Sequence, residues 1–170
     1  VGNPFSVGAS YQVSINGKRI PYLENMINAL DQTGPIGKLI TIQLLPEDLP
    51  LVKTGRMVIR IDDLTTGAGD GFAIDFAELL INPKKLAFVQ NISGIVVDED
   101  TKAGIGGALV SATNVVETTT DDQGGFVLMN VPAGLALITA SKTGYAMKTL
   151  PYDEYNYEGM DDKTITIPLK

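Results

Sequence analysis

The sequence contains neither cysteine nor histidine, and these two absences exclude several kinds of chemistry. Without cysteine there is no disulfide and no thiolate. Without histidine there is no Ser-His-Asp triad, no Cys-His pair and none of the usual zinc sites. A hydrolase that uses a pair of carboxylates needs only Asp and Glu, but no stretch of the sequence predicts a cleft. We therefore expect the chain not to be an enzyme.

Basic residues are scarce in the second half of the chain. Residues 1–88 have a net charge of −1, whereas residues 89–170 have a net charge of −6. Nucleic-acid phosphates require Lys and Arg, so this balance argues against a nucleic-acid partner. No apolar run approaches the length of a membrane span. The chain begins at Val1 without an initiator Met or a signal region, from which we expect it to be part of a longer protein.

Glycine, threonine, valine and isoleucine are frequent, and short alternating segments favour an all-β fold. In the first half, strands are predicted at residues 11–15, 18–23, 38–45, 56–62 and 72–82, with helical turns at 24–30 and 46–53. Asn16-Gly17 predicts a hairpin turn. The polar segment at 82–90 contains a proline and predicts a boundary between two tandem β-sandwich domains, residues 1–88 and 89–170.

The run Gly-Asp-Gly-Phe-Ala-Ile-Asp-Phe at residues 69–76 resembles the closing strand of many secreted carbohydrate-binding modules. This resemblance implies a jelly-roll-like sandwich for residues 1–88. Ordinary core alternation after a glycine turn explains the same pattern.

The second half is organised around residues 118–134, which predict a strand end, a tight turn at 121–125, a short strand at 126–129 and another turn at 131–134. Phe126 and Leu128 alternate onto one face and are expected in a core. Further strands are predicted at 91–98, 108–113, 115–120, 135–140, 145–149 and 164–169. Pro168 cannot donate to a β-ladder, which favours an edge position for the last strand.

Five motifs follow one another with a familiar spacing: Ser93-Gly-Ile-Val-Val-Asp98, Ile105 with Gly107-Ala-Leu-Val110, Thr118 to Gly124 with Phe126, Val131-Pro-Ala-Gly134, and Lys142-Thr-Gly-Tyr145. Over residues 90–170 they resemble carboxypeptidase regulatory-like domains. Gly104 and Ala136 depart from the pattern, which usually has Pro and an aromatic residue there. The resemblance implies a seven-stranded, transthyretin-like (prealbumin-like) sandwich that serves as a non-catalytic accessory module. Some related surface sandwiches contain a Lys–Asn isopeptide bond, but residues 164–170 offer no Asn for one.

Four aspartates form the first candidate site: Asp62, Asp63, Asp70 and Asp75. Calcium prefers several oxygen ligands, and an acidic, glycine-rich loop between strands can supply them. The alternative is a solvated turn with a cross-strand Arg60–Asp75 pair. The pair Asp121-Asp122 is a weaker metal candidate, because such residues commonly bond to the backbone of their own turn.

The segment between residues 151 and 163 is the second candidate. Tyr152, Tyr155 and Tyr157 could stack on a sugar or a partner, assisted by Asp153 and Asn156. Alternatively, the tyrosines fold back over the edge of the sandwich.

A polar sheet face is the third candidate, and its members include Arg60 and Gln43. We expect a structural or adhesive module of a secreted or cell-surface protein, whose partners are the other domains of that protein. The alternatives are a carbohydrate-binding accessory of an extracellular hydrolase and a regulatory appendage of a peptidase.

Overall fold

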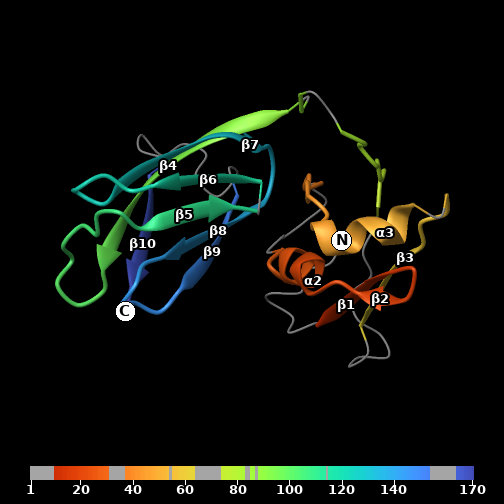
Figure 1. Cartoon of the computed structure of the whole chain (residues 1–170), viewed down its shortest axis with the longest axis horizontal. Coiled ribbons are helices and arrows are strands. Elements are labelled where there is room, and N and C mark those ends of the chain that lie inside the picture. Colours follow the sequence, from red (N-terminus) through yellow and green to blue (C-terminus); the bar gives the residue numbers. More distant parts are fainter. Residues whose placement is uncertain are drawn as a thin grey trace. The chain divides into compact units, whose positions relative to one another are not determined.

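The computed structural model describes residues 10–30, 37–53, 55–63, 74–82, 85–86, 88–113, 115–153 and 164–170. Strands dominate these residues, and the helices are short, which confirms the all-β prediction (Figure 1). The chain forms two compact units. The first unit comprises Val1–Lys38 and Leu44–Pro83, and the second comprises Leu39–Gln43 and Lys84–Lys170.

The first unit is built on a three-stranded antiparallel sheet with the order β2-β1-β3. Strand β1 (Tyr11–Ile15) turns at Asn16-Gly17 into β2 (Lys18–Arg19), as predicted. Both turn residues have positive φ, 49° and 85°, which matches the twist of a tight hairpin. Strand β3 (Ile59–Asp63) pairs with the other edge of β1. Alternate residues of β1 are therefore buried, and Ile20 and Met26 join them in a small core.

Short helices account for the rest of the regular structure in this unit. Helix α2 (Pro21–Asn28) is followed by the 3-10 turn η1 (Pro46–Asp48) and by α3 (Leu49–Val52), so the predicted helical segment at 46–53 is confirmed. The prediction of a return strand to residue 23 is wrong. The strand ends at Arg19 because Pro21 starts a helix, where its missing N–H costs nothing.

Two other strand predictions in the first half are also wrong. Residues 38–45 form only an isolated bridge between Ile40 and Leu135. Residues 74–82 are described, yet they belong to no strand. The described part of the first unit therefore holds one sheet, and a jelly-roll would require a second one.

The second unit consists of two sheets. One has the order β10-β4-β7, from β4 (Val89–Asp98), β7 (Gly125–Pro132) and β10 (Ile165–Leu169). The other has the order β6-β5-β8-β9, from β5 (Leu109–Ala112), β6 (Val116–Thr119), β8 (Ala136–Ser141) and β9 (Lys148–Tyr152). Strand β10 runs parallel to β4, and the other pairings are antiparallel. Pro168 lies in an edge strand, as predicted.

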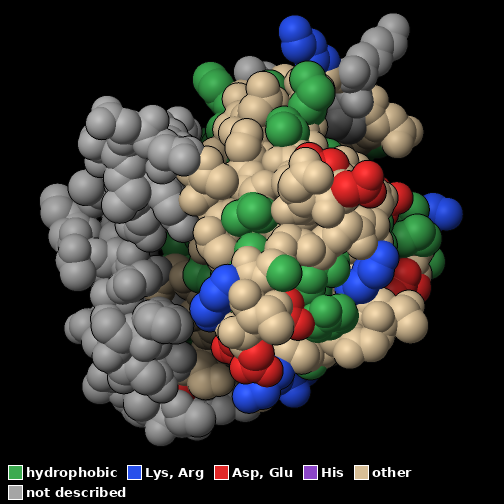
Figure 2. Space-filling view, turned by 90° about the vertical axis from the view of Figure 1, so that its left-hand side faces the viewer, with side chains coloured by type: hydrophobic (Ala, Val, Ile, Leu, Met, Phe, Trp, Pro, Cys, Tyr) green, Lys and Arg blue, Asp and Glu red, His purple; other side chains and the backbone are tan. Residues whose placement is uncertain are grey.

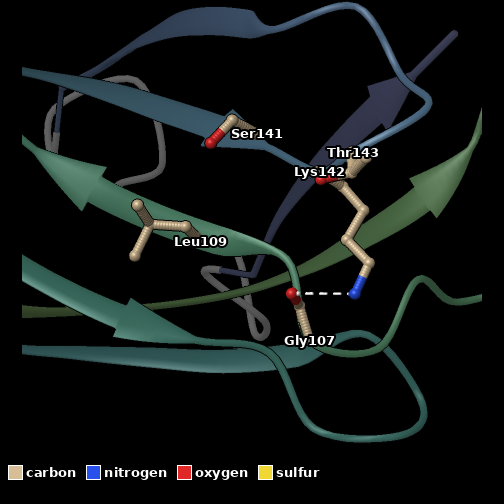
Figure 3. Close-up of a pocket in the computed structure, with 5 residues that line it drawn as sticks. All are labelled: Gly107, Leu109, Ser141, Lys142 and Thr143. Atoms are coloured by element: carbon tan, nitrogen blue, oxygen red, sulfur yellow. Dashed lines mark hydrogen bonds between the residues drawn. The ribbon is translucent and has the colours of Figure 1, made fainter.

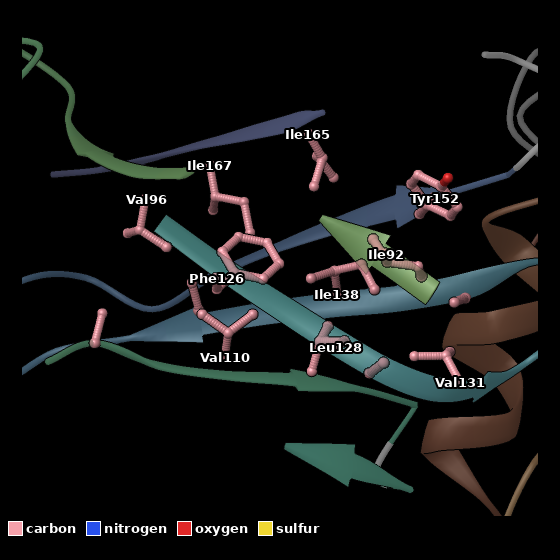
Figure 4. Close-up of a cluster of buried hydrophobic side chains, with 14 of the residues drawn as sticks. Ile92, Val96, Val110, Phe126, Leu128, Val131, Ile138, Tyr152, Ile165 and Ile167 are labelled. Atoms are coloured by element: carbon pink, nitrogen blue, oxygen red, sulfur yellow. The ribbon is translucent and has the colours of Figure 1, made fainter. Parts of the chain in front are cut away.

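Alternating side chains from both sheets fill the core between them (Figure 4). Phe126 and Leu128 are buried on β7, which confirms their predicted role, and Ile165 and Ile167 of β10, in the same sheet, are buried in the same core. Gly94 is required in β4 because a side chain there would meet the ring of Phe126 and the carbonyl of Ile165. Burial of these side chains supplies the main stabilising free energy of the unit.

A short segment from early in the chain belongs to the second unit. Within Leu39–Gln43, the carbonyl of Leu39 accepts a hydrogen bond of 3.1 Å from the amide of Leu135. Gly134, at φ 99°, leaves room for this approach of one backbone to another. The segment therefore lies against the turn between β7 and β8.

Candidate functional site

Asp98, at the end of β4, accepts hydrogen bonds at both of its carboxylate oxygens. Its Oδ1 accepts hydrogen bonds from the Thr101 amide (2.8 Å), the Thr101 hydroxyl (2.9 Å) and the Asp100 amide (3.1 Å). Its Oδ2 accepts a bond of 3.2 Å from the Tyr145 hydroxyl. The bond from the Thr101 amide is the main reason why the pKa of Asp98 is lowered. The carboxylate thus holds the turn after β4 and ties Tyr145 to it.

A second carboxylate closes the turn before β7. The Oδ1 of Asp121 accepts hydrogen bonds from the amides of Gln123 (2.9 Å) and Gly125 (2.7 Å). Nearby, the buried hydroxyl of Thr120 donates to the Ile105 carbonyl (2.7 Å) and accepts from the Ala108 amide (2.8 Å). The two bonds to Asp121 are the bonds to the backbone of its own turn that the sequence predicts. These polar groups act on the chain's own backbone.

Replacing Asp121 with alanine should destabilise the second unit by about 1–2 kcal/mol, because two amides of a tight turn lose their acceptor. Urea-induced unfolding followed by circular dichroism measures the effect. The matched control is Asp122→Ala, the next residue, which is exposed and makes no hydrogen bond to this turn within the described residues. Equal effects of the two substitutions would contradict the assignment.

The surface of the second unit has a shallow hollow lined by Gly107, Leu109, Ser141, Lys142 and Thr143 (Figure 3). The Lys142 ammonium group donates a hydrogen bond of 3.0 Å to the Gly107 carbonyl across this hollow. Acidic and basic side chains are interspersed with apolar ones on the face drawn in Figure 2. Neither the hollow nor this face carries a cluster of like charges that would select one class of ligand.

The structure assigns Tyr152 to the core rather than to a binding loop. Its side chain is 2% exposed and belongs to the apolar cluster between the sheets, so its ring cannot stack on a ligand. This corrects the binding prediction for Tyr152 and agrees with the alternative in which tyrosines fold back. Asp153 is buried as well. The other members of that candidate site, Tyr155, Asn156 and Tyr157, lie outside the described residues.

The four-aspartate candidate is only partly described. Asp62 accepts a hydrogen bond of 2.7 Å from Arg60, two residues earlier on the same strand face. Asp63 lies in β3 and Asp75 is exposed, whereas Asp70 lies outside the described residues. Among the residues that the structure describes, no three carboxylates gather closely enough to hold a metal. Calcium binding stays a prediction.

The predicted polar face is not assembled on one sheet. Arg60 lies in β3, whose sheet partner is β1. Gln43 is exposed in the extended segment Leu39–Gln43, which is part of the second unit. The predicted pair between Arg60 and Asp75 is also not formed, because Arg60 bonds to Asp62 instead.

Two buried carboxylates of the first unit were not predicted from the sequence. Both oxygens of Glu24 accept hydrogen bonds from Arg19, at 2.7 and 2.8 Å, and Oε1 also accepts one of 3.0 Å from the Val13 amide. Asp48 accepts bonds from Lys18 (2.6 Å) and from the Tyr22 hydroxyl (2.9 Å). Loss of hydration raises the pKa of Tyr22 to about 12. The acceptor sites of both carboxylates are used within the fold, which indicates a structural role.

The bonds to Glu24 predict a pH-dependent stability of the first unit. The hydrogen bond from Arg19 holds the pKa of Glu24 below its ordinary value. A lowered pKa in the folded state contributes stability above the pKa of the unfolded state, and this contribution is lost as the pH falls through the folded value. At about pH 7, Glu24→Gln should cost about 1–3 kcal/mol of unfolding free energy.

Chemical denaturation of the original chain and of Glu24→Gln, at about pH 7 and about pH 3, provides the test. The difference between their unfolding free energies should be smaller at about pH 3. Glu47→Gln, in an exposed position of the same unit, is the control. A difference that grows as the pH falls would contradict the assignment.

The described residues of the second unit define its class: they form a β-sandwich of seven strands, and the carboxylates of Asp98 and Asp121 hold its turns. The comparison with known families gives the particular type. Residues 91–168 match the family model of the carboxypeptidase regulatory-like domain, which confirms the resemblance seen in the sequence. Domains of this type are non-catalytic β-sandwich modules. No curated protein matches the chain.

Proposed function

We propose that this chain is a structural module of a larger secreted or cell-surface protein, in which it spaces, displays or joins other domains. The observation that carries the proposal is the use of polar groups in the second unit. Asp98 and Asp121 each accept at least two hydrogen bonds from their own turns, and the Thr120 hydroxyl bonds to Ile105 and Ala108 in the loop before β5. Such bonds stabilise the sandwich, and they pair these polar groups within the fold without a ligand.

The hollow beside Lys142 supports the same proposal. A ligand that needed the ammonium group would have to compete with the Gly107 carbonyl. In addition, no helix of the described residues is long and apolar enough to cross a membrane.

Glycan-array binding of the whole chain separates this proposal from a carbohydrate-binding accessory. A structural module should bind no sugar specifically. Specific binding of one sugar that is lost in Tyr155→Ala and retained in Tyr155→Phe would overturn the proposal, because aromatic stacking would then be a function of the chain. The folded state of both variants is checked by their melting temperatures.

The description of the matched family favours a second candidate, a regulatory appendage of a peptidase. The two candidates differ in the parent protein: the second requires a peptidase domain in the same polypeptide. Sequencing the full gene distinguishes them.

A further inference from the structure

The turn between β1 and β2 is formed by Asn16 and Gly17, a pair of residues that is prone to spontaneous deamidation. In this reaction, the backbone nitrogen that follows an asparagine attacks the side-chain carbon Cγ. Glycine hinders the attack least, because it has no side chain. Both residues are exposed, so water and base can reach the turn. The pair would therefore react readily in a chain without structure.

In the folded first unit, three hydrogen bonds hold the side-chain amide of Asn16. Its Nδ2 donates to the carbonyls of Leu51 (2.7 Å) and Arg56 (2.9 Å), and its Oδ1 accepts from the Val58 amide (2.9 Å). The backbone amide of Asn16 also donates to the Val58 carbonyl, at 2.9 Å. Both N–H donors of the side chain are thus used. Departure of Nδ2 breaks two of these bonds, so the reaction should proceed mainly from a locally opened state.

We propose that Asn16 is a deamidation site that the folded first unit protects and that reacts when the hairpin opens. In the opened state, the Gly17 nitrogen loses its proton to a base and bonds to Cγ of Asn16. The bond between Cγ and Nδ2 breaks, and Nδ2 leaves as ammonia. Water then opens the resulting cyclic succinimide at either of its carbonyl carbons. One opening gives aspartate, and the other gives isoaspartate, so water is the only co-reactant consumed.

The products should prevent the hairpin from closing again. An aspartate in place of Asn16 has no N–H when ionised, so its carboxylate would face the Leu51 and Arg56 carbonyls, which are acceptors too. Isoaspartate lengthens the backbone between Ile15 and Lys18, which are directly paired. Each opening therefore carries a chance of permanent damage. The inference goes beyond the structural role proposed above, since it sets a chemical limit on the lifetime of the first unit.

The rate of modification tests the protection. The full chain is incubated in mildly alkaline buffer with and without a denaturing concentration of guanidinium chloride, and modified Asn16 is quantified by peptide mapping with mass spectrometry. The reaction should be at least about tenfold slower in the folded chain, since only the opened population reacts. Equal rates in the two conditions would overturn the proposal.

A destabilised variant tests whether opening of the hairpin controls the rate. Glu24 bonds to both strands of the hairpin, through the Val13 amide and the Arg19 side chain. Glu24→Gln should therefore accelerate modification of Asn16 in the folded chain by at least about twofold. Glu47→Gln, the same change at an exposed position of this unit, is the control and should leave the rate unchanged. The same rate in both variants would count against the proposal.

The predicted effect of the product is measured with Asn16→Asp. This variant should unfold at a lower denaturant concentration than the original chain, and the difference should shrink in acid, where the protonated carboxyl group regains a donor. Asn25→Asp, the same chemical change at an exposed position of α2, is the matched control. If Asn16→Asp and Asn25→Asp were equally stable at neutral pH, deamidation would not lock the hairpin open and the proposal would fail.

Discussion

Replacing Gly124 with alanine should destabilise the second unit by about 3 kcal/mol or more, through backbone strain and a steric clash. Gly124 has φ 83°, a conformation that costs any other residue free energy. A Cβ atom at this position would also lie 2.7 Å from the Ile105 amide nitrogen and 3.0 Å from Cα of Gly104. Both contacts are with backbone, which cannot rotate away as a side chain can.

Gly144→Ala is the matched control, because Gly144 also has a positive φ, 93°, but has open space where its Cβ would be. It should cost only about 1 kcal/mol, the contribution of backbone strain alone. Urea-induced unfolding of the two variants separates the two contributions. Equal losses of stability would mean that the loops around Gly124 are not packed as described.

Leu128→Ala should reduce the unfolding free energy of the second unit by about 3 kcal/mol, because it leaves a cavity in a close-packed core. Leu128 is fully buried in the cluster that joins the two sheets. The neighbouring Met129 is 60% exposed on the other face of β7. Met129→Ala should therefore change stability by no more than about 0.5 kcal/mol.

This pair of variants tests the register of β7, because neighbouring residues of a strand point to opposite faces. Denaturation midpoints of both proteins, measured under the same conditions, are sufficient. A larger loss in Met129→Ala than in Leu128→Ala would place the strand one residue out of register.

The second unit was well predicted because its pattern is local. Alternation at Phe126 and Leu128 identified the buried face, and the turn residues Asp121 and Gly124 fixed the strand ends. Gly104, which departs from the family pattern, also has a physical explanation. Any side chain there would meet the backbone of Gln123, so glycine allows the two loops to pack together.

The incorrect and missed predictions concern features that depend on residues far apart in the sequence. The pattern of residues 38–45 favours a strand, but a strand needs a partner, and the described structure pairs only Ile40, with Leu135. Tyr152 was assigned to a loop because polar residues follow it, although it is the last residue of β9 and points into the core. Burial of Glu24 depends on Arg19 and on the amide of Val13, and no local pattern reveals that arrangement.

Residue-resolved hydrogen exchange of the whole chain tests the central claim most directly, namely that the second unit is a packed seven-stranded sandwich. Amides bonded between strands deep in a sheet open only with large-scale unfolding. Strands β4, β5 and β8 each have a partner on both sides, whereas β6 and β9 are edge strands. The slowest amides should therefore lie in β4, β5 and β8. Exchange in these strands as fast as in β6 would contradict the two-sheet arrangement.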